Sequence, residues 1–260
     1  EDGRPPVYTG GLCFCHHKST SIQRRFKCSS RLSLSNAPAS TGNAASNDAP
    51  EKPLRRVRAS LNRATPSLSG FVMLLSLQGR SAEPIHHEVL FPSEYDTEFD
   101  DVFGRRGRPA QPPRDPAVYI CNPQDPQMRP PDGEAWFVLV NAPRHSKEPD
   151  DRTVDWDQPG LGQAYADEVL EFMAQRGVEV RHRILHREVI TPADLERGTG
   201  SPGGAIYGTA SHGPRAAFLR PANQSPLRGL YLVGGSAHPG GGLPLVGMSA
   251  EIVSDLIGKA

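Results

Sequence analysis

Near its carboxyl end the chain reads Gly229-Leu230-Tyr231-Leu232-Val233-Gly234-Gly235-Ser236-Ala237-His238-Pro239-Gly240-Gly241-Gly242-Leu243-Pro244, and this stretch decides the fold. An apolar run enters a turn in which five of nine residues are glycine, and the apolar period beyond it predicts a helix from about Pro244 to Ile257. Glycine lets a ligand approach the backbone closely. The amino end of a helix offers free N–H groups and positive dipole to an anion or an electron-rich ring. By itself the turn predicts either such a ligand site or a tight loop exposed to solvent.

The core of this stretch, His238 to Pro244, and the Ser249-Ala250 pair that follows it resemble a known pattern. They are similar to the carboxy-terminal flavin-binding segment of the phytoene desaturase family of carotenoid dehydrogenases. Five stretches upstream also resemble this family in order and spacing, so that the resemblance covers about residues 53–258: Ser67–Val72, His86–Phe91, Asp96–Phe99, Ala135–Pro143 and Gly203–Gly208.

The resemblance implies an α/β fold, part of a two-domain flavoprotein that binds FAD. It would comprise a substrate-domain sheet with helices and a C-terminal FAD-binding strand, turn and helix. Family members begin with a βαβ unit whose GxGxxG binds the ADP half of FAD. No GxGxxG follows a predicted strand in this chain. We therefore expect the C-terminal portion of a desaturase joined to an unrelated leader, inactive by itself.

Composition divides the chain unevenly. Residues 1–66 hold 11 Lys and Arg against 4 Asp and Glu, and residues 67–260 hold 18 against 25. Residues 29–50 are almost wholly Ser, Ala, Asn, Pro and Thr, a composition that does not offset the entropy lost on ordering. We expect a disordered, low-complexity arm over 1–52, a polyene-binding substrate domain over 53–200, and the C-terminal part of a FAD-binding domain over 201–260.

Between the arm and the glycine turn, periodicity predicts strands and helices in alternation. Short apolar or alternating runs predict strands at 69–77, 85–91, 117–121, 136–140 and 178–184. Helical spacing predicts helices at 93–103 and 159–177, the second ended by Gly177. Thr191-Pro192-Ala193-Asp194 has the residues of a helix start. The expected sheet is mainly antiparallel and backed by helices.

The resemblance assigns roles within the turn. Gly234, Gly235 and Ser236 would contact the ribityl and phosphate region of FAD, and Gly240, Gly241, Gly242, Leu243 and Pro244 would lie near the isoalloxazine. His238 is the one titratable side chain of the turn. It would either shuttle a proton, since an unperturbed histidine titrates near 6.5, or only bond the turn backbone.

Other candidate positions are assigned on the apolar pattern and on ligand spacing. Phe71, Leu74, Trp136 and Phe137 would form an apolar wall for a long hydrocarbon, or else an ordinary sheet core. His86 and His87 are neighbours, and within a strand they would face opposite sides. Cys13, Cys15 and Cys28 match no common zinc spacing, so we expect a solvated tail there. Four other histidines lack a partner at ligand spacing, and no metal is assigned: His145, His182, His186 and His212.

The function implied by the resemblance is FAD-dependent desaturation of phytoene or a related polyene. The flavin takes a hydride and the protein orients the substrate. Three alternatives stay open: a desaturase of hydroxylated carotenoids, a polyene isomerase of the same family, and a non-catalytic remnant. Product analysis would separate the enzymes, and a bound yellow chromophore would exclude the remnant.

Composition also limits the partners. The longest apolar run, Phe71 to Leu75, is far short of the roughly 20 residues of a transmembrane helix. A polyene substrate therefore implies peripheral membrane contact. The acidic body argues against nucleic acid as a partner. Four cysteines without a disulfide framework suit a reducing, cytoplasmic setting. The pattern does not indicate an oligomeric state.

Overall fold

The structure is a computed structural model that describes residues 8–9, 55, 59, 63–105, 107–210, 220–227 and 229–258. The predicted arm, with its three cysteines, lies outside this part of the chain apart from strand β1 (Tyr8–Thr9). β1 pairs in parallel with β9 (Leu232–Val233). His212 also lies outside the described residues. The predicted disorder of the arm and the predicted domain boundaries stay predictions.

A five-stranded antiparallel sheet forms the body, in the order β3-β4-β5-β2-β8. Its two long central strands are β2 (Ser69–Gln78) and β5 (Gly133–Ala142). β4 (Val118–Cys121) and β3 (His87–Leu90) extend one side, and β8 (Ile184–Ile190) closes the other. The predicted antiparallel sheet is therefore confirmed, although the ends of β2, β3, β4 and β5 differ from the predicted ends by up to three residues.

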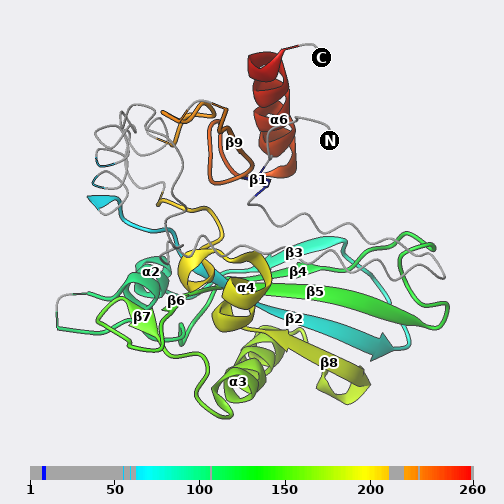
Figure 1. Ribbon diagram of the computed structural model, residues 1–260. Coiled ribbons are helices and arrows are strands. Elements are labelled where there is room, and N and C mark those ends of the chain that lie inside the picture. The colour runs from blue at the N-terminus through cyan, green and yellow to red at the C-terminus, as the bar shows by residue number, and fades with distance from the viewer. Residues whose placement is uncertain are drawn as a thin grey trace, which may run out of the picture.

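Strict alternation along the two central strands separates the faces of this sheet. Phe71 and Met73 of β2 lie opposite Val140 and Val138 of β5, and all four are buried. Helix α3 (Leu161–Gln175) covers this face and adds Tyr165, whose ring meets that of Phe71 edge to face. Figure 1 shows α3 under the sheet, on the side away from the carboxyl-terminal helix. Because alternate residues point to opposite faces, the even-numbered residues of β2 are left facing the other side.

Shorter elements complete the body. Helix α2 (Tyr95–Phe103) follows β3 as predicted, and two short strands, β6 (Arg144–His145) and β7 (Thr153–Val154), pair in parallel. Helix α4 (Pro192–Thr199) leads into the 3₁₀ turn η2 (Pro202–Gly204). Among the described residues, no helix is long and apolar enough to cross a membrane.

The predicted strand over 178–184 is wrong. Residues Arg181–Arg183 form the 3₁₀ turn η1, and β8 begins only at Ile184. The carboxylate of Glu179 accepts from the Arg181 backbone N–H at 2.9 Å and from its guanidinium, which curls the backbone locally. The alternation arises because Val178 packs against the core and Val180 is buried in it, without a strand neighbour.

The prediction that His86 and His87 face opposite sides is also wrong. β3 begins at His87, so His86 lies in the bend before the strand, where side-chain alternation does not apply. Their rings stack with centroids 4.3 Å apart, on the same side of the chain.

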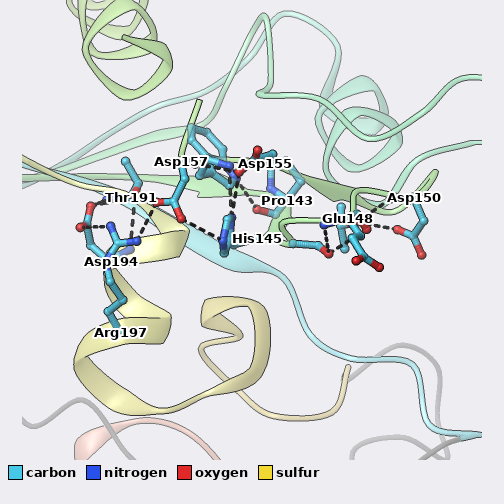
Figure 2. A network of polar contacts seen from close by, with 12 residues as sticks. Pro143, His145, Glu148, Asp150, Asp155, Asp157, Thr191, Asp194 and Arg197 are labelled. Atoms are coloured by element: carbon cyan, nitrogen blue, oxygen red, sulfur yellow. Dashed lines mark hydrogen bonds and ion pairs between the residues drawn. The ribbon is translucent and has the colours of Figure 1, made fainter. Parts of the chain in front are cut away.

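Helix α4 starts at the predicted capping sequence. The Thr191 side chain accepts from the Asp194 backbone N–H, and the Asp194 carboxylate accepts from the Thr191 backbone N–H at 2.9 Å. Arg197 then joins Asp194 to Asp157, and Asp157 lies 3.6 Å from Nε2 of the buried His145 (Figure 2). This network ties α4 to β6 and to the segment that follows β7.

The glycine-rich stretch forms the predicted strand, turn and helix. β9 is only two residues long, the turn spans residues 234–242, and helix α6 (Leu243–Ile257) follows it. In Figure 1, β9 and α6 lie on the opposite side of the sheet from α3. Backbone bonds from Ile206 to Leu68 and from Ser67 to Gly208 join the segment before the turn to the start of β2.

Candidate functional site

A cavity of about 280 Å³ lies between the open face of the sheet and the glycine turn. Nearly every side chain that faces it is apolar. The sheet and α4 contribute Gly70, Val72, Phe137, Leu139, Ile190 and Leu195, and the other wall is Ile206, Tyr207, Gly235, Gly241, Gly242, Leu243 and Val246.

Strand register builds the floor of the cavity. Val72 of β2 lies between Leu139 of β5 and Ile190 of β8, so one residue from each strand meets on the open face. Gly70 adds no side chain to this floor. A Cβ there would lie 3.0 Å from the Leu139 side chain. The floor is therefore a flat apolar surface.

Glycine backbone forms part of the opposite wall, at Gly235, Gly241 and Gly242. A Cβ at Gly241 would lie 2.6 Å from the Tyr207 ring, and a Cβ at Gly235 would lie 3.3 Å from the Cα of Gly241. These glycines therefore let the turn fold on itself and let the aromatic ring pack on its backbone. Gly242, with φ +107°, precedes the first residue of α6 and makes no side-chain cap.

Helix α6 thus begins at the cavity wall without a capping side chain. The first N–H groups of a helix have no intrahelical partner and carry the positive end of its dipole. Gly242 and Leu243, on either side of this helix start, both line the cavity. The site combines a polar, positive edge with apolar walls.

Two buried side chains hold the turn: Ser249, which the sequence pattern included without a role, and Asn223, which it did not single out. The Asn223 amide donates to the carbonyl oxygens of Leu232 and His238 and to the Ser249 hydroxyl at 2.9–3.0 Å. Ser249, fully buried on α6, accepts from the Gly234 backbone N–H at 3.1 Å. Asn223 lies in an irregular segment whose pattern gives no signal, because its three acceptors come from three separate places in the chain.

Arg220 links two parts of the wall, Tyr207 and Gly235, from outside the cavity lining. Arg220 donates to the carbonyl oxygens of Gly235 and Tyr207 at 2.9 and 3.0 Å. Tyr207 falls within the Gly203–Gly208 stretch, so the pattern that carried the resemblance was a signal that could have singled it out.

The predicted flavin-contact residues divide into two groups. Gly235, Gly241, Gly242 and Leu243 line the cavity, and Gly234, Ser236, Gly240 and Pro244 do not. Gly234 is buried, and its backbone N–H donates to the Ser249 hydroxyl. The His238 side chain is exposed and lies outside the cavity lining.

The predicted hydrocarbon wall divides in a similar way. Phe137 lines the cavity, and Leu74 is its cross-strand neighbour on the same sheet face. Phe71 and Trp136 point to the other face and lie in the core with α3. Residue parity along the two strands accounts for this division, and it removes Phe71 and Trp136 from the cavity.

One match to GxGxxG does occur, at Gly198-Thr199-Gly200-Ser201-Pro202-Gly203, and it follows a helix rather than a strand. Gly200 ends α4 with φ +72°, and a Cβ at Gly203 would lie 3.0 Å from the His145 carbonyl oxygen. These glycines serve a helix end and a close backbone contact.

Comparison with known proteins gives a consistent set of relatives. The chain is 34% identical over 211 residues to hydroxyneurosporene desaturase of Rubrivivax gelatinosus, covering 79% of this chain and 38% of that protein. It is 34% identical over 212 residues to 1-hydroxycarotenoid 3,4-desaturase of Flavobacterium sp. (strain P99-3), covering 80% and 40%. It is 32% identical over 199 residues to 4,4'-diaponeurosporene oxygenase of Staphylococcus haemolyticus (strain JCSC1435), covering 74% and 37%.

No protein-family model matches the chain. An oxidoreductase from Methanosarcina mazei aligns in structure over 78% of this chain and 37% of its own, with 16% identity and a TM-score of 0.43. The chain spans about two fifths of the length of the three relatives named above. By its sequence, the chain belongs to the carotenoid desaturase-type family.

Proposed function

We propose that this chain supplies the polyene-binding sheet and the flavin-side wall of a FAD-dependent carotenoid oxidoreductase. One observation carries the proposal: a cavity has a flat apolar sheet for its floor and an exposed glycine backbone at a helix start for its wall. The floor suits a hydrocarbon chain, and the wall suits a planar ring that carries negative charge when reduced.

The residues of the wall fit FAD on two counts. Gly241 and Gly242 bring no side chain between the backbone and the cavity, so a flat ring can approach it. The uncapped start of α6 favours electron-rich ring atoms. When bound, FAD would accept the hydride removed from a carbon beside the polyene. The protein holds the polyene on Val72, Leu139 and Ile190 and excludes water.

The names of the relatives favour a hydroxylated carotenoid over phytoene as the substrate of this site. Two of the three act by name on hydroxyneurosporene or a 1-hydroxycarotenoid. A second candidate is oxygenation, because the third is by name a diaponeurosporene oxygenase. The proposal includes peripheral contact with a membrane from a cytoplasmic location, since polyenes partition into lipid.

Polyene binding tests the floor of the cavity. We expect a hydroxylated carotenoid in detergent to quench the tryptophan fluorescence of the full chain, because Trp136 and Trp156 both lie in the sheet core. Ile190→Lys places a charge on the floor and should weaken binding by about tenfold or more, equivalent to ~1.4 kcal/mol. Leu185→Lys is the matched control on the same strand, at a side chain that is 66% exposed. Equal binding by both variants would show that the polyene does not lie on this floor.

Flavin binding tests the proposed flavin-side wall, and turnover tests the proposed reaction. Among the described residues the proposed cofactor contacts lie on the flavin side alone, so we expect FAD to bind no more than about threefold tighter than FMN, a difference of under ~1 kcal/mol. We also expect no turnover of phytoene or hydroxylated carotenoids by this polypeptide alone, measured by chromatography of extracted pigments. Any product would overturn this expectation, and its chemistry, desaturated or oxygenated, would identify the reaction. If neither flavin bound, the non-catalytic alternative would replace this proposal.

A further inference from the structure

Two histidines and one cysteine meet at the β3 edge of the sheet. His87 of β3 lies directly opposite Cys121 of β4, and His86 precedes the strand with its ring stacked on that of His87. One ligand atom from each of the three side chains lies within 4.8 Å of the other two. Cys121 is also the cross-strand neighbour of Phe137, so this cluster lies beside the cavity floor.

One of the two imidazoles is already oriented. Nδ1 of His87 lies 2.8 Å from the Tyr119 hydroxyl oxygen, and the two rings stack at 5.9 Å. With Nδ1–H donating to this hydroxyl, the lone pair of Nε2 is free for a ligand. Histidines that bind metals usually donate their other ring N–H in this manner, which fixes the tautomer and the ring plane.

The donor atoms of this cluster are accessible. His86 and His87 are exposed and Cys121 is half-buried. A second group, His145 with Asp155 and Asp157, differs in this respect (Figure 2). There, Nδ1 of His145 accepts from the Trp156 backbone N–H at 3.1 Å, and Asp157 accepts from Arg197 at 2.6 Å. Those donors are committed within the protein, so that group carries no metal proposal.

We propose that His86, His87 and Cys121 bind a divalent transition metal ion of the zinc type, with water in the fourth position. Two imidazoles and a thiolate form a donor set that suits Zn²⁺ and Co²⁺ and disfavours Mg²⁺ and Ca²⁺. On binding, the Cys121 thiol loses its proton to solvent and the sulfur bonds the metal as thiolate. The ion joins the segment before β3 to β4. This inference does not depend on the proposed redox function.

Cobalt binding to the untagged full chain tests the site. The background is the Cys13→Ser, Cys15→Ser, Cys28→Ser variant, in which Cys121 is the only thiol. We expect one Co²⁺ per chain, with a thiolate-to-cobalt charge-transfer band that disappears on further Cys121→Ser substitution. His86→Ala and His87→Ala should each weaken binding, and Tyr119→Phe should weaken it by about tenfold or more because His87 loses its hydrogen bond to the Tyr119 hydroxyl.

Matched controls separate this site from general surface binding. His182→Ala removes another exposed histidine and should leave Co²⁺ affinity unchanged. Tyr95→Phe is the control for Tyr119→Phe, since Tyr95 is exposed on α2. Because His86 and His87 are exposed, their replacement leaves no cavity in the core, and circular dichroism should show unchanged secondary structure. Absence of the charge-transfer band in the background variant, or equal affinity after loss of either histidine, would overturn the proposal.

Discussion

Gly241 shows how a single missing side chain shapes the candidate site. The Tyr207 ring occupies the place that a Cβ would take, at 2.6 Å, and both residues line the cavity. Any larger residue must displace the ring toward the cavity or push the turn away from α6. Glycine is required here because a side chain would collide with the Tyr207 ring. Its backbone conformation is open to other residues, since its φ does not fall in the left-handed region.

Replacement of Gly241 should therefore close the site without unfolding the protein. We expect Gly241→Ala to weaken flavin and polyene binding by about tenfold or more, or ~1.4 kcal/mol each. Gly247→Ala is the matched control, because a Cβ there meets no atom within 4 Å. Fluorescence titration measures both, and equal affinities in the two variants would mean that the turn wall does not contact the ligands.

Glu98 is a buried carboxylic acid whose surroundings raise its pKa. Its side chain is buried at 1% exposure, and burial raises its pKa although Asn141 and a backbone N–H stabilise the ionised form. Oε1 accepts from Asn141 at 3.0 Å, and Oε2 has no hydrogen-bond partner among the described residues. Burial therefore disfavours the ionised form of Glu98 in the folded state relative to the unfolded chain.

This raised pKa predicts a pH-dependent effect of Glu98→Gln. The stability contributed by Glu98 is present below its ordinary pKa of 4.5 and is lost as pH rises through the higher folded value. The variant should therefore gain free energy of unfolding relative to wild type as pH rises above 4.5. Urea unfolding measures this difference. The exposed Glu94→Gln variant should show no such trend, and a flat difference for Glu98→Gln would refute the assignment.

At the scale of elements, helix α4 is held by its first turn and its last. The Thr191 capping box starts it, and Arg197 ties it to Asp157, whose pKa Arg197 lowers below its usual value. Leu195 of this helix lines the cavity. The helix position therefore affects both stability and the site.

Loss of the cap should cost stability and loosen the cavity together. We expect Thr191→Ala to lower the free energy of unfolding by about 1 kcal/mol. Polyene affinity should fall in the same variant, because Leu195 moves with the helix. Thr191→Ser retains the hydroxyl and should restore both quantities, measured by urea unfolding and by tryptophan quenching. Loss of stability with unchanged polyene affinity would show that α4 does not position the cavity wall.

A buried ion pair joins strand ends on the other side of the sheet. Glu134 of β5, 2% exposed, lies 2.8 Å from Arg183, which also donates to the carbonyl oxygens of Gln78 and Gly79. Burial alone would raise the pKa of Glu134. Hydrogen bonds from Ser81, Asn122 and Arg183 outweigh burial and lower it.

Removing Arg183 should be strongly destabilising. Arg183→Ala leaves a buried carboxylate without its counter-ion, a loss of about 3–5 kcal/mol in comparable pairs. Because the folded pKa of Glu134 is lowered, its contribution is present above 4.5 and is lost as pH falls through the folded value. Urea unfolding of Glu134→Gln should accordingly show a shallower loss of stability in acid. Arg187→Ala is the control, since its partner Asp167 is exposed.

For the whole molecule, the cavity belongs to both the sheet and the glycine turn, so ligands should stabilise the two together. A ligand at 100 times its Kd adds about 2.7 kcal/mol to the free energy of unfolding. We expect a hydroxylated carotenoid to raise the Tm of the described body in one cooperative transition, followed by circular dichroism. Ile190→Lys should abolish the shift. Two separate transitions, only one of them ligand-dependent, would contradict a shared site.

The sequence by itself determined the elements whose cause is local. The apolar runs over 69–77 and 136–140, the period of 159–177 and the Thr191 cap each act within a few residues, and each appears in the structure near its predicted place. The glycine turn and the helix after it could be predicted for the same reason. Local alternation failed at 178–184, where burial without strand pairing produced the same pattern.

Only the tertiary structure decided which residues meet. Strand register and parity assigned Phe137 to the cavity and Phe71 and Trp136 to the core, because a shift of one residue reverses the face of every side chain. Long-range bonds of Asn223 placed the turn against α6. The pairing of His87 with Cys121 across 34 residues created a cluster that no spacing rule predicts, since the sheet and not the chain brings these atoms together.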